Sequence, residues 1–181
     1  MQGYARTTPG FSLCGLNCAL CPRYNTDGSS RCPGCGGLDF RLKHPACAVI
    51  GCSRRHGNVE YCFACEKYPC DRYLRTGEKD SFISYRNVLE DNEKARADLG
   101  RYLSDLEKKK EYLDYFLEKY NDGKSKGFFC LAINLLPIED IEEIAANAKE
   151  KEKPEGPRTE FVKSLFHEKA RNRGIEIALR K

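Results

Sequence analysis

Residues 14–35 read CGLNCALCPRYNTDGSSRCPGC and hold five of the eleven cysteines of this 181-residue chain. A second dense stretch, YCFACEKYPC, occupies residues 61–70 and holds three more. With Cys47 and Cys52 between the two stretches, ten cysteines fall before residue 71, and only Cys130 lies beyond it. Residues 1–75 are also rich in Gly and Pro and poor in aliphatic residues. We therefore expect no helix or strand long enough for an ordinary core there, and something other than apolar packing must organise this part of the chain.

The cysteine spacing is typical of zinc sites. Three C-x-x-C pairs occur, at Cys18/Cys21, Cys32/Cys35 and Cys62/Cys65, and Cys47/Cys52 is a wider pair. A tetrahedral zinc ion with Zn–S bonds of about 2.3 Å needs sulfurs roughly 3.7 Å apart, and one tight turn can supply two such ligands. Gly34, between Cys32 and Cys35, favours that turn.

This spacing predicts two structural zinc ions with four cysteine ligands each. The simplest division places Cys18, Cys21, Cys32 and Cys35 in one site and Cys47, Cys52, Cys62 and Cys65 in the other. A cross-braced division, which joins the first pair to the third and the second to the fourth, uses the same eight residues and stays open. Cys14 and Cys70 are left over, and each could replace a neighbouring ligand or remain a free thiol. Structural zinc is worth on the order of 10–16 kcal/mol in small peptides, so a core-poor segment can fold on metal.

An iron–sulfur cluster is the main alternative cofactor. Cys14-x3-Cys18-x2-Cys21 has the ligand spacing of radical S-adenosylmethionine enzymes, and Pro22 after Cys21 is similar to the Cys-Pro pair of ferredoxins. Such an enzyme needs a barrel of alternating strands and helices after the motif. The sequence after Cys21 predicts no such barrel. The iron–sulfur hypothesis is therefore that of a redox protein or an enzyme component.

No catalytic group stands out. A catalytic zinc ion keeps an open coordination position beside a general base, and no such set is evident. Complete sites can be drawn from cysteine alone, so we interpret His44, His56 and His167 as surface residues or as partners of ligands. Cys130, in the apolar run FFCLAI, is interpreted as a buried core residue. We expect a protein without catalytic activity.

The cysteine count and the N-terminus predict a cytoplasmic protein. An odd number of cysteines cannot pair completely, and no basic head with an apolar segment marks an export signal at the N-terminus. The longest apolar run has six residues, far below the ~20 that cross a bilayer, so no membrane association is expected.

The charge distribution argues against nucleic acid as a partner. The formal net charge is +4, and residues 1–75 carry an excess of five positive charges. Two divalent ions held by eight thiolates would add four negative charges and reduce this excess to about +1. We interpret the arginines as screening anionic metal–thiolate sites, and keep a nucleic-acid-binding zinc protein only as a third hypothesis.

The second half of the chain predicts helices. Apolar residues recur at helical spacing in four segments, and Asp80 or Ser81, Asn121-Asp122-Gly123, Pro137 and Gly174 mark several of their ends. The dense apolar run at residues 128–136 suits either a strand or a buried helix by periodicity, and we favour a helix. The five predicted helices cover residues 81–97, 99–120, 128–136, 138–149 and 161–173. Residues 149–157 read as a linker, and the alternation of Ile175, Ile177 and Leu179 predicts one short strand.

The expected fold is thus a small metal-stabilised, cysteine-rich N-terminal domain, residues 1–75, followed by a mainly α-helical domain, residues 76–181, with little β structure. The expected function is a zinc-binding module whose helices offer a surface to a protein partner.

The cysteine motifs also resemble a known family. These are Cys14-Gly15-Leu16-x-Cys18-x-x-Cys21-Pro22-x-Tyr24, Cys32-Pro33-Gly34-Cys35, Cys47 with Cys52, and Tyr61-Cys62-x-x-Cys65-Glu66-x-Tyr68-Pro69-Cys70. Over about residues 12–75 they resemble the bacterial and archaeal family catalogued as domain of unknown function 3795, and FFCLAINLL at 128–136 resembles a longer branch of it. The resemblance implies a small cytoplasmic, zinc-binding protein and assigns neither a substrate nor a catalytic residue.

Overall fold

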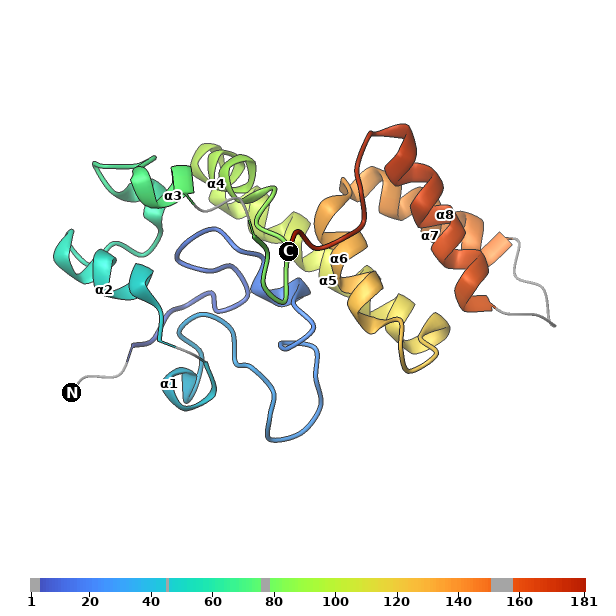
Figure 1. The fold of residues 1–181 in the computed structure, drawn as a ribbon, viewed down its shortest axis with the longest axis horizontal. Helices are drawn as coiled ribbons and strands as arrows, with labels where there is room; N and C mark the ends of the chain where they lie inside the picture. The colour runs from blue at the N-terminus through green and yellow to red at the C-terminus, as the bar shows by residue number, and fades with distance from the viewer. Residues whose placement is uncertain (1–3, 45, 76–78, 151–157) are drawn as a thin grey trace.

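A computed structural model describes residues 4–44, 46–75, 79–150 and 158–181 (Figure 1). Within these residues the chain forms helices and no strand, which confirms the expectation of a mainly helical protein with little β structure. The α-helices are α1 (Phe40–Lys43), α2 (Ala48–Arg55), α3 (Asp71–Arg75), α4 (Val88–Ala97), α5 (Leu99–Tyr120), α6 (Lys126–Leu135), α7 (Ile138–Glu150) and α8 (Arg158–Asn172).

The cysteine-rich part consists of loops and short helical segments, as its composition predicts. Two of the C-x-x-C pairs begin 3-10 turns, at Cys18–Leu20 and Cys62–Ala64. In both, the backbone N–H of the second cysteine donates to the carbonyl of the first at 3.0 Å. In these two pairs the spacing of two residues therefore forms a tight turn, as predicted, and the turn brings the two cysteines close together.

The later helices form where the apolar spacing places them, and the four predictions for α5 to α8 are confirmed. Asp98 caps α5, because its carboxylate accepts from the N–H of Arg101 at 2.9 Å. The apolar run at residues 128–136 lies in α6, whose side chains fill the centre of the helical group: Phe129, Cys130, Ala132, Ile133 and Leu135. The predicted linker lies largely outside the described residues.

One apolar core connects the two parts of the chain. Leu113 and Phe116 of α5 pack in the same cluster as Phe129 of α6, together with residues of α7 and α8. Phe11 and Leu20 of the cysteine-rich part belong to this cluster as well. A second, smaller cluster gathers Leu13, Cys35, Phe40 and Ile50 inside the cysteine-rich part.

The predicted start of the first long helix is wrong. α4 begins at Val88, and residues 79–87 form an irregular loop. Asp80 does not cap a helix, because its carboxylate instead accepts from the backbone N–H of Tyr85 at 2.8 Å and from the Ser84 hydroxyl at 3.2 Å. This local bonding holds the loop in place of the first helical turn.

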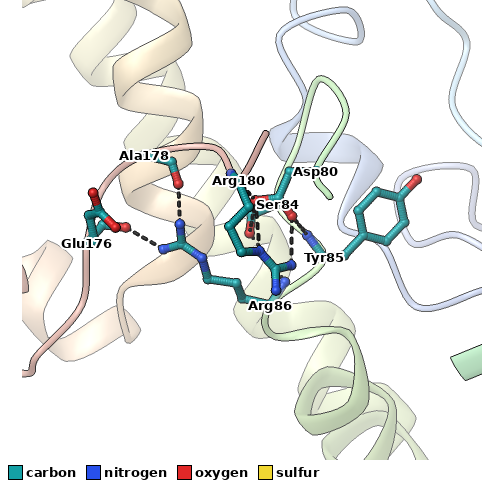
Figure 2. A network of polar contacts seen from close by, with 7 residues as sticks. All are labelled: Asp80, Ser84, Tyr85, Arg86, Glu176, Ala178 and Arg180. Atoms are coloured by element: carbon teal, nitrogen blue, oxygen red, sulfur yellow. Dashed lines mark hydrogen bonds and ion pairs between the residues drawn. The ribbon is translucent and has the colours of Figure 1, made fainter. Parts of the chain in front are cut away.

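The predicted C-terminal strand is also wrong, since residues 175–181 contain no strand. The alternation instead reflects packing, because Ile175 and Ile177 lie against the main core. The carbonyls of Glu176 and Ala178 accept hydrogen bonds from the Arg86 guanidinium rather than from a neighbouring strand (Figure 2). The Arg86 side chain, and not a second strand, is therefore the hydrogen-bond partner of these two carbonyls.

Candidate metal centre

All ten cysteines of residues 1–75 line one cavity of about 990 Å³. They are Cys14, Cys18, Cys21, Cys32, Cys35, Cys47, Cys52, Cys62, Cys65 and Cys70. The opposite wall comes from the loop before α4, through Ser81, Phe82, Ile83 and Tyr85, and from Val88 of α4 itself. The cavity therefore lies where the cysteine-rich part meets the helices.

The turn from Ser12 to Cys18 places the first thiols. The Ser12 hydroxyl oxygen accepts from the Leu16 N–H at 2.7 Å and lies 3.2 Å from the Cys14 sulfur. The Cys62 N–H donates to the Leu13 carbonyl at 2.8 Å. This last bond brings the third C-x-x-C pair alongside Cys14, although the two are 48 positions apart in the sequence.

Two buried side chains fix the backbone at Cys14. Tyr73 of α3 donates from its hydroxyl to the Cys14 carbonyl at 2.8 Å, and the Asn92 amide of α4 donates to the same oxygen at 3.2 Å. Asn92 can come this close because Gly15, at φ 90°, has no side chain: a Cβ there would lie 2.3 Å from the amide nitrogen. The Tyr73 backbone N–H also donates to the Cys70 carbonyl at 2.7 Å, so Tyr73 connects the two cysteines left over from the eight predicted ligands.

The pair Cys32/Cys35 is held by backbone bonds to the N-terminal loop. The Cys32 N–H donates to the Arg23 carbonyl and the Cys35 N–H to the Pro9 carbonyl, each at 2.9 Å. Gly34 has φ 79°, and a Cβ there would lie 2.3 Å from the Pro9 carbonyl oxygen. Gly34 therefore adopts the left-handed conformation that glycine favours. The Cys35 N–H, however, donates to Pro9 and not back to Cys32, so this pair lacks the turn bond found in the other two C-x-x-C pairs.

The histidines differ in their positions. His56 lies at the cavity, with Nδ1 2.9 Å from the Cys52 carbonyl oxygen and 3.7 Å from the Cys52 sulfur. His44 also lines the cavity and stacks on the Phe40 ring at 4.6 Å. His167 lies on α8 against the Phe128 ring.

Burial and hydrogen bonding act on the thiols in opposite directions. Burial raises the pKa of Cys14, Cys18 and Cys21, and it raises the pKa of Cys62 to about 12. Backbone N–H groups lower the pKa of the first three: that of Leu16 acts on Cys14, that of Cys35 on Cys18, and those of Arg23 and Tyr24 on Cys21. Burial is the larger effect, so the pKa of each of these thiols is raised overall, and a thiolate here would need a cation to compensate its charge.

The charged side chains at the cavity are mostly basic. Arg23, Lys43 and Arg72 line it, against one acid, Asp71. This balance agrees with the interpretation that basic residues screen an anionic set of thiolates. The donor chemistry of the cavity therefore fits a thiophilic metal.

The cysteine side chains lie farther apart than the ligands of a formed metal site. All eleven cysteines are thiols rather than disulfides, yet no three Cys, His, Asp or Glu side chains among the described residues lie close enough to hold one ion. The ten cysteines share one cavity, so the division into two sets of four stays a prediction. Metal binding would draw the thiols closer across the cavity.

The cysteine pattern does not predict several residues that line the cavity or, like Asn92, hold the backbone of its cysteines. Tyr73, Asn92 and the loop at residues 79–87 meet the cysteines only through tertiary contacts, and no local motif marks them. Cys130 is the reverse case: its position in an apolar run predicts burial, and it is 1% exposed in α6.

The fold and the cavity define a helical protein with a shared pocket of ten thiols. Residues 10–75, the cysteine-rich part of the chain, match the model of the family described as Protein of unknown function (DUF3795). Comparison with curated proteins and comparison with solved structures each gave no match. In the part of the chain that the structure describes, the helices are too short or too polar to span a bilayer.

Proposed function

We propose that this chain is a non-catalytic metal-binding protein whose N-terminal cysteines hold structural zinc, with about two ions per chain. The observation that carries the proposal is the convergence of all ten N-terminal cysteines on one cavity. Ten thiols at one cavity, with basic side chains around them, suit divalent ions bound as thiolates. We further propose that the protein works in the cytoplasm, where reducing conditions keep thiols available as ligands.

The metal would supply folding free energy that the apolar residues of this segment do not. Among the described residues, the apolar cluster confined to the cysteine-rich part is small, and the other buried apolar residues of this part, such as Phe11 and Leu20, pack into the core shared with the helices. Ligation ties together loops that are otherwise joined by single hydrogen bonds, such as those of Cys32 and Cys35. A structural role follows, since binding to a site that exists only in the folded chain stabilises that fold.

An iron–sulfur protein is the second candidate. The observation that favours it is that Cys14, Cys18 and Cys21 lie together on one cavity, whose volume exceeds the needs of a single ion. Acid-labile sulfide and visible absorption after anaerobic purification would support this candidate, and a colourless zinc protein would remove it.

We also propose that the protein acts through a protein partner. Leu38 and Leu42 of the α1 region are both 84% exposed, and Arg41 and Lys43 lie beside them. These side chains suit a partner segment with apolar and acidic residues. The substitution Leu42→Glu should weaken such a complex without changing the metal content.

Cobalt titration tests the zinc proposal. The reduced, metal-free chain should bind Co²⁺ with thiolate charge-transfer absorption, saturate near two ions and lose the colour when Zn²⁺ is added, because Zn²⁺ binds thiolates more tightly. Cys130→Ser is the matched control and should titrate like the wild type, since Cys130 lies away from the cavity. Absence of saturable absorption in the wild type would contradict the proposal.

A further inference from the structure

Residues 79–87 form an irregular loop that contributes one wall of the cysteine cavity. Ser81, Phe82, Ile83 and Tyr85 of this loop line the cavity. What holds the loop is Asp80, whose side chain is 0% exposed. Its carboxylate accepts from Tyr85 N–H and the Ser84 hydroxyl, so the loop is closed around one carboxylate.

The same carboxylate binds the end of the chain, 100 positions later. The Arg180 guanidinium donates to Asp80 at 2.8 Å, and the Arg180 backbone N–H donates to it at 2.9 Å. In return the Asp80 N–H donates to the Arg180 carbonyl at 3.0 Å. Figure 2 shows this network together with Arg86, which donates from the other side of the loop to the Glu176 and Ala178 carbonyls.

The path of the tail is set by the end of α8. Gly174, at φ 65°, turns the chain, the Gly174 N–H donates to the Arg171 carbonyl, and the Ile175 N–H donates to the Ala170 carbonyl at 2.8 Å. Ile175 and Ile177 then pack on the core. In Figure 1 the tail runs from α8 back to the middle of the molecule, beside the loop before α4.

We propose that residues 175–181 form a strap that holds the loop at residues 79–87 against the cysteine cavity and so limits access from solvent to the thiols. The consequence for metal exchange rests on the proposed function, because the cavity is the proposed metal site. Access to the thiols does not depend on that function. The contacts are numerous for a seven-residue tail, and three hydrogen bonds from Arg180 reach the buried Asp80 carboxylate.

The ion pair is suited to a permanent contact. Burial alone would raise the pKa of Asp80, but the hydrogen bonds from Arg180 and from the Tyr85 N–H outweigh it, so the pKa lies well below its usual range. Asp80 therefore stays ionised at neutral pH, and a pH change near neutrality does not remove the charge that binds the strap.

Thiol labelling with a maleimide, read peptide by peptide by mass spectrometry, tests the strap. Arg180→Ala removes the guanidinium from Asp80. Arg173→Ala is the matched control, because Arg173 forms a comparable pair with buried Asp140 in the same part of the chain but does not touch the cavity wall. Cys130, buried in α6, reports on global unfolding within every sample.

We expect Arg180→Ala to increase the labelling rate of the cavity cysteines at least about tenfold, since loss of charge-assisted bonds favours local opening. The Cys130 rate should not change, and Arg173→Ala should label like the wild type. Unchanged cavity labelling in Arg180→Ala, or an equal increase in Arg173→Ala, would overturn the strap. An increase at Cys130 that parallels the cavity cysteines would overturn it too, because the contact would then support the whole fold.

Arg86→Met provides a second variant, which removes the donors to Glu176 and Ala178 while leaving Asp80 with Arg180. It should also increase cavity labelling selectively, and wild-type rates in this variant would count against the strap. Labelling is run on the protein as purified and after chelation. If the purified chain contains no metal but shows the selective increase, the strap proposal is supported and the zinc proposal is refuted. If the chain contains zinc but shows no increase, the zinc proposal is supported and the strap proposal is refuted.

Discussion

At the scale of single residues, Gly15 decides whether the Cys14 backbone can reach its partners. Gly15 and Gly28 both have positive φ, 90° and 82°, but only Gly15 faces another group, the Asn92 amide. Substituting alanine at each glycine therefore separates two contributions to the loss of unfolding free energy. One comes from the left-handed backbone conformation, and the other from the close approach of Asn92 to residue 15.

We predict that Gly28→Ala costs about 1 kcal/mol of unfolding free energy, from the left-handed conformation alone. Gly15→Ala should cost roughly 1–3 kcal/mol more, because the new methyl group displaces Asn92 from the Cys14 carbonyl. Urea denaturation of both variants measures the difference. Equal costs would show that Asn92 does not fix Cys14.

A buried carboxylate gives the stability of the chain a pH dependence. Asp91 of α4 accepts from the Asn17 amide at 3.0 Å, and burial raises its pKa to about 6 despite the nearby Lys109. The other groups that act on it are Tyr102, Lys94 and Glu90. A raised folded pKa means that the folded state binds the proton more tightly, so stability falls as pH rises from about 4 to about 6.

Asp91→Asn should remove this dependence. Relative to the wild type, the variant should gain on the order of 2 kcal/mol at pH 7.5 and almost nothing near pH 3, where Asp91 is largely protonated in both states. The comparison uses urea unfolding of both proteins at each pH, so that protonation of metal ligands cancels. A difference that does not vary with pH would contradict the raised pKa.

At the scale of elements, the sequence predicts those helices whose apolar residues recur at helical spacing and form one buried face. α5 and α7 carry their apolar residues at helical spacing, and local signals at Asn121 and Pro137 mark the end of α5 and the start of α7. The start of α4 and the C-terminal tail are wrongly predicted, because the residues there are held by long-range side-chain bonds. Asp80 and Arg180 are 100 positions apart, and local periodicity does not report such a contact.

The cap of α5 can be tested directly. Asp98→Ala should lower the unfolding free energy by about 1 kcal/mol, because the Arg101 N–H loses its acceptor. Asp98→Asn keeps an acceptor oxygen and should lie within about 0.5 kcal/mol of the wild type. Thermal unfolding followed by circular dichroism gives both values, and similar losses in the two variants would refute the role of the cap.

At the scale of the whole molecule, the cysteine composition predicts the chemistry of the candidate site but not its enclosure. The spacing of Cys18/Cys21 and Cys62/Cys65 predicts turns that present thiols, and the turns are present. That a loop before α4 and the C-terminal tail complete the cavity follows only from the folded chain. The core residues shared between the two parts, such as Phe11 and Phe116, likewise come from tertiary packing.

This shared core predicts that metal removal affects the entire protein. Phe11 and Leu20 pack in the cluster that contains α5 and α6, so loosening of the cysteine-rich part exposes the helices as well. Chelation should lower the melting temperature of a single transition that circular dichroism at 222 nm and tyrosine fluorescence report together. Two separate transitions, with the helical one unaffected by chelation, would instead show two independent domains.

The most direct test of the metal-binding account is the metal content of the anaerobically purified chain, measured by elemental analysis together with its visible spectrum. The account predicts about two zinc ions per chain and no colour. Iron with visible absorption would replace zinc by the iron–sulfur candidate. A folded chain without metal, whose cavity thiols all titrate freely, would contradict metal binding itself.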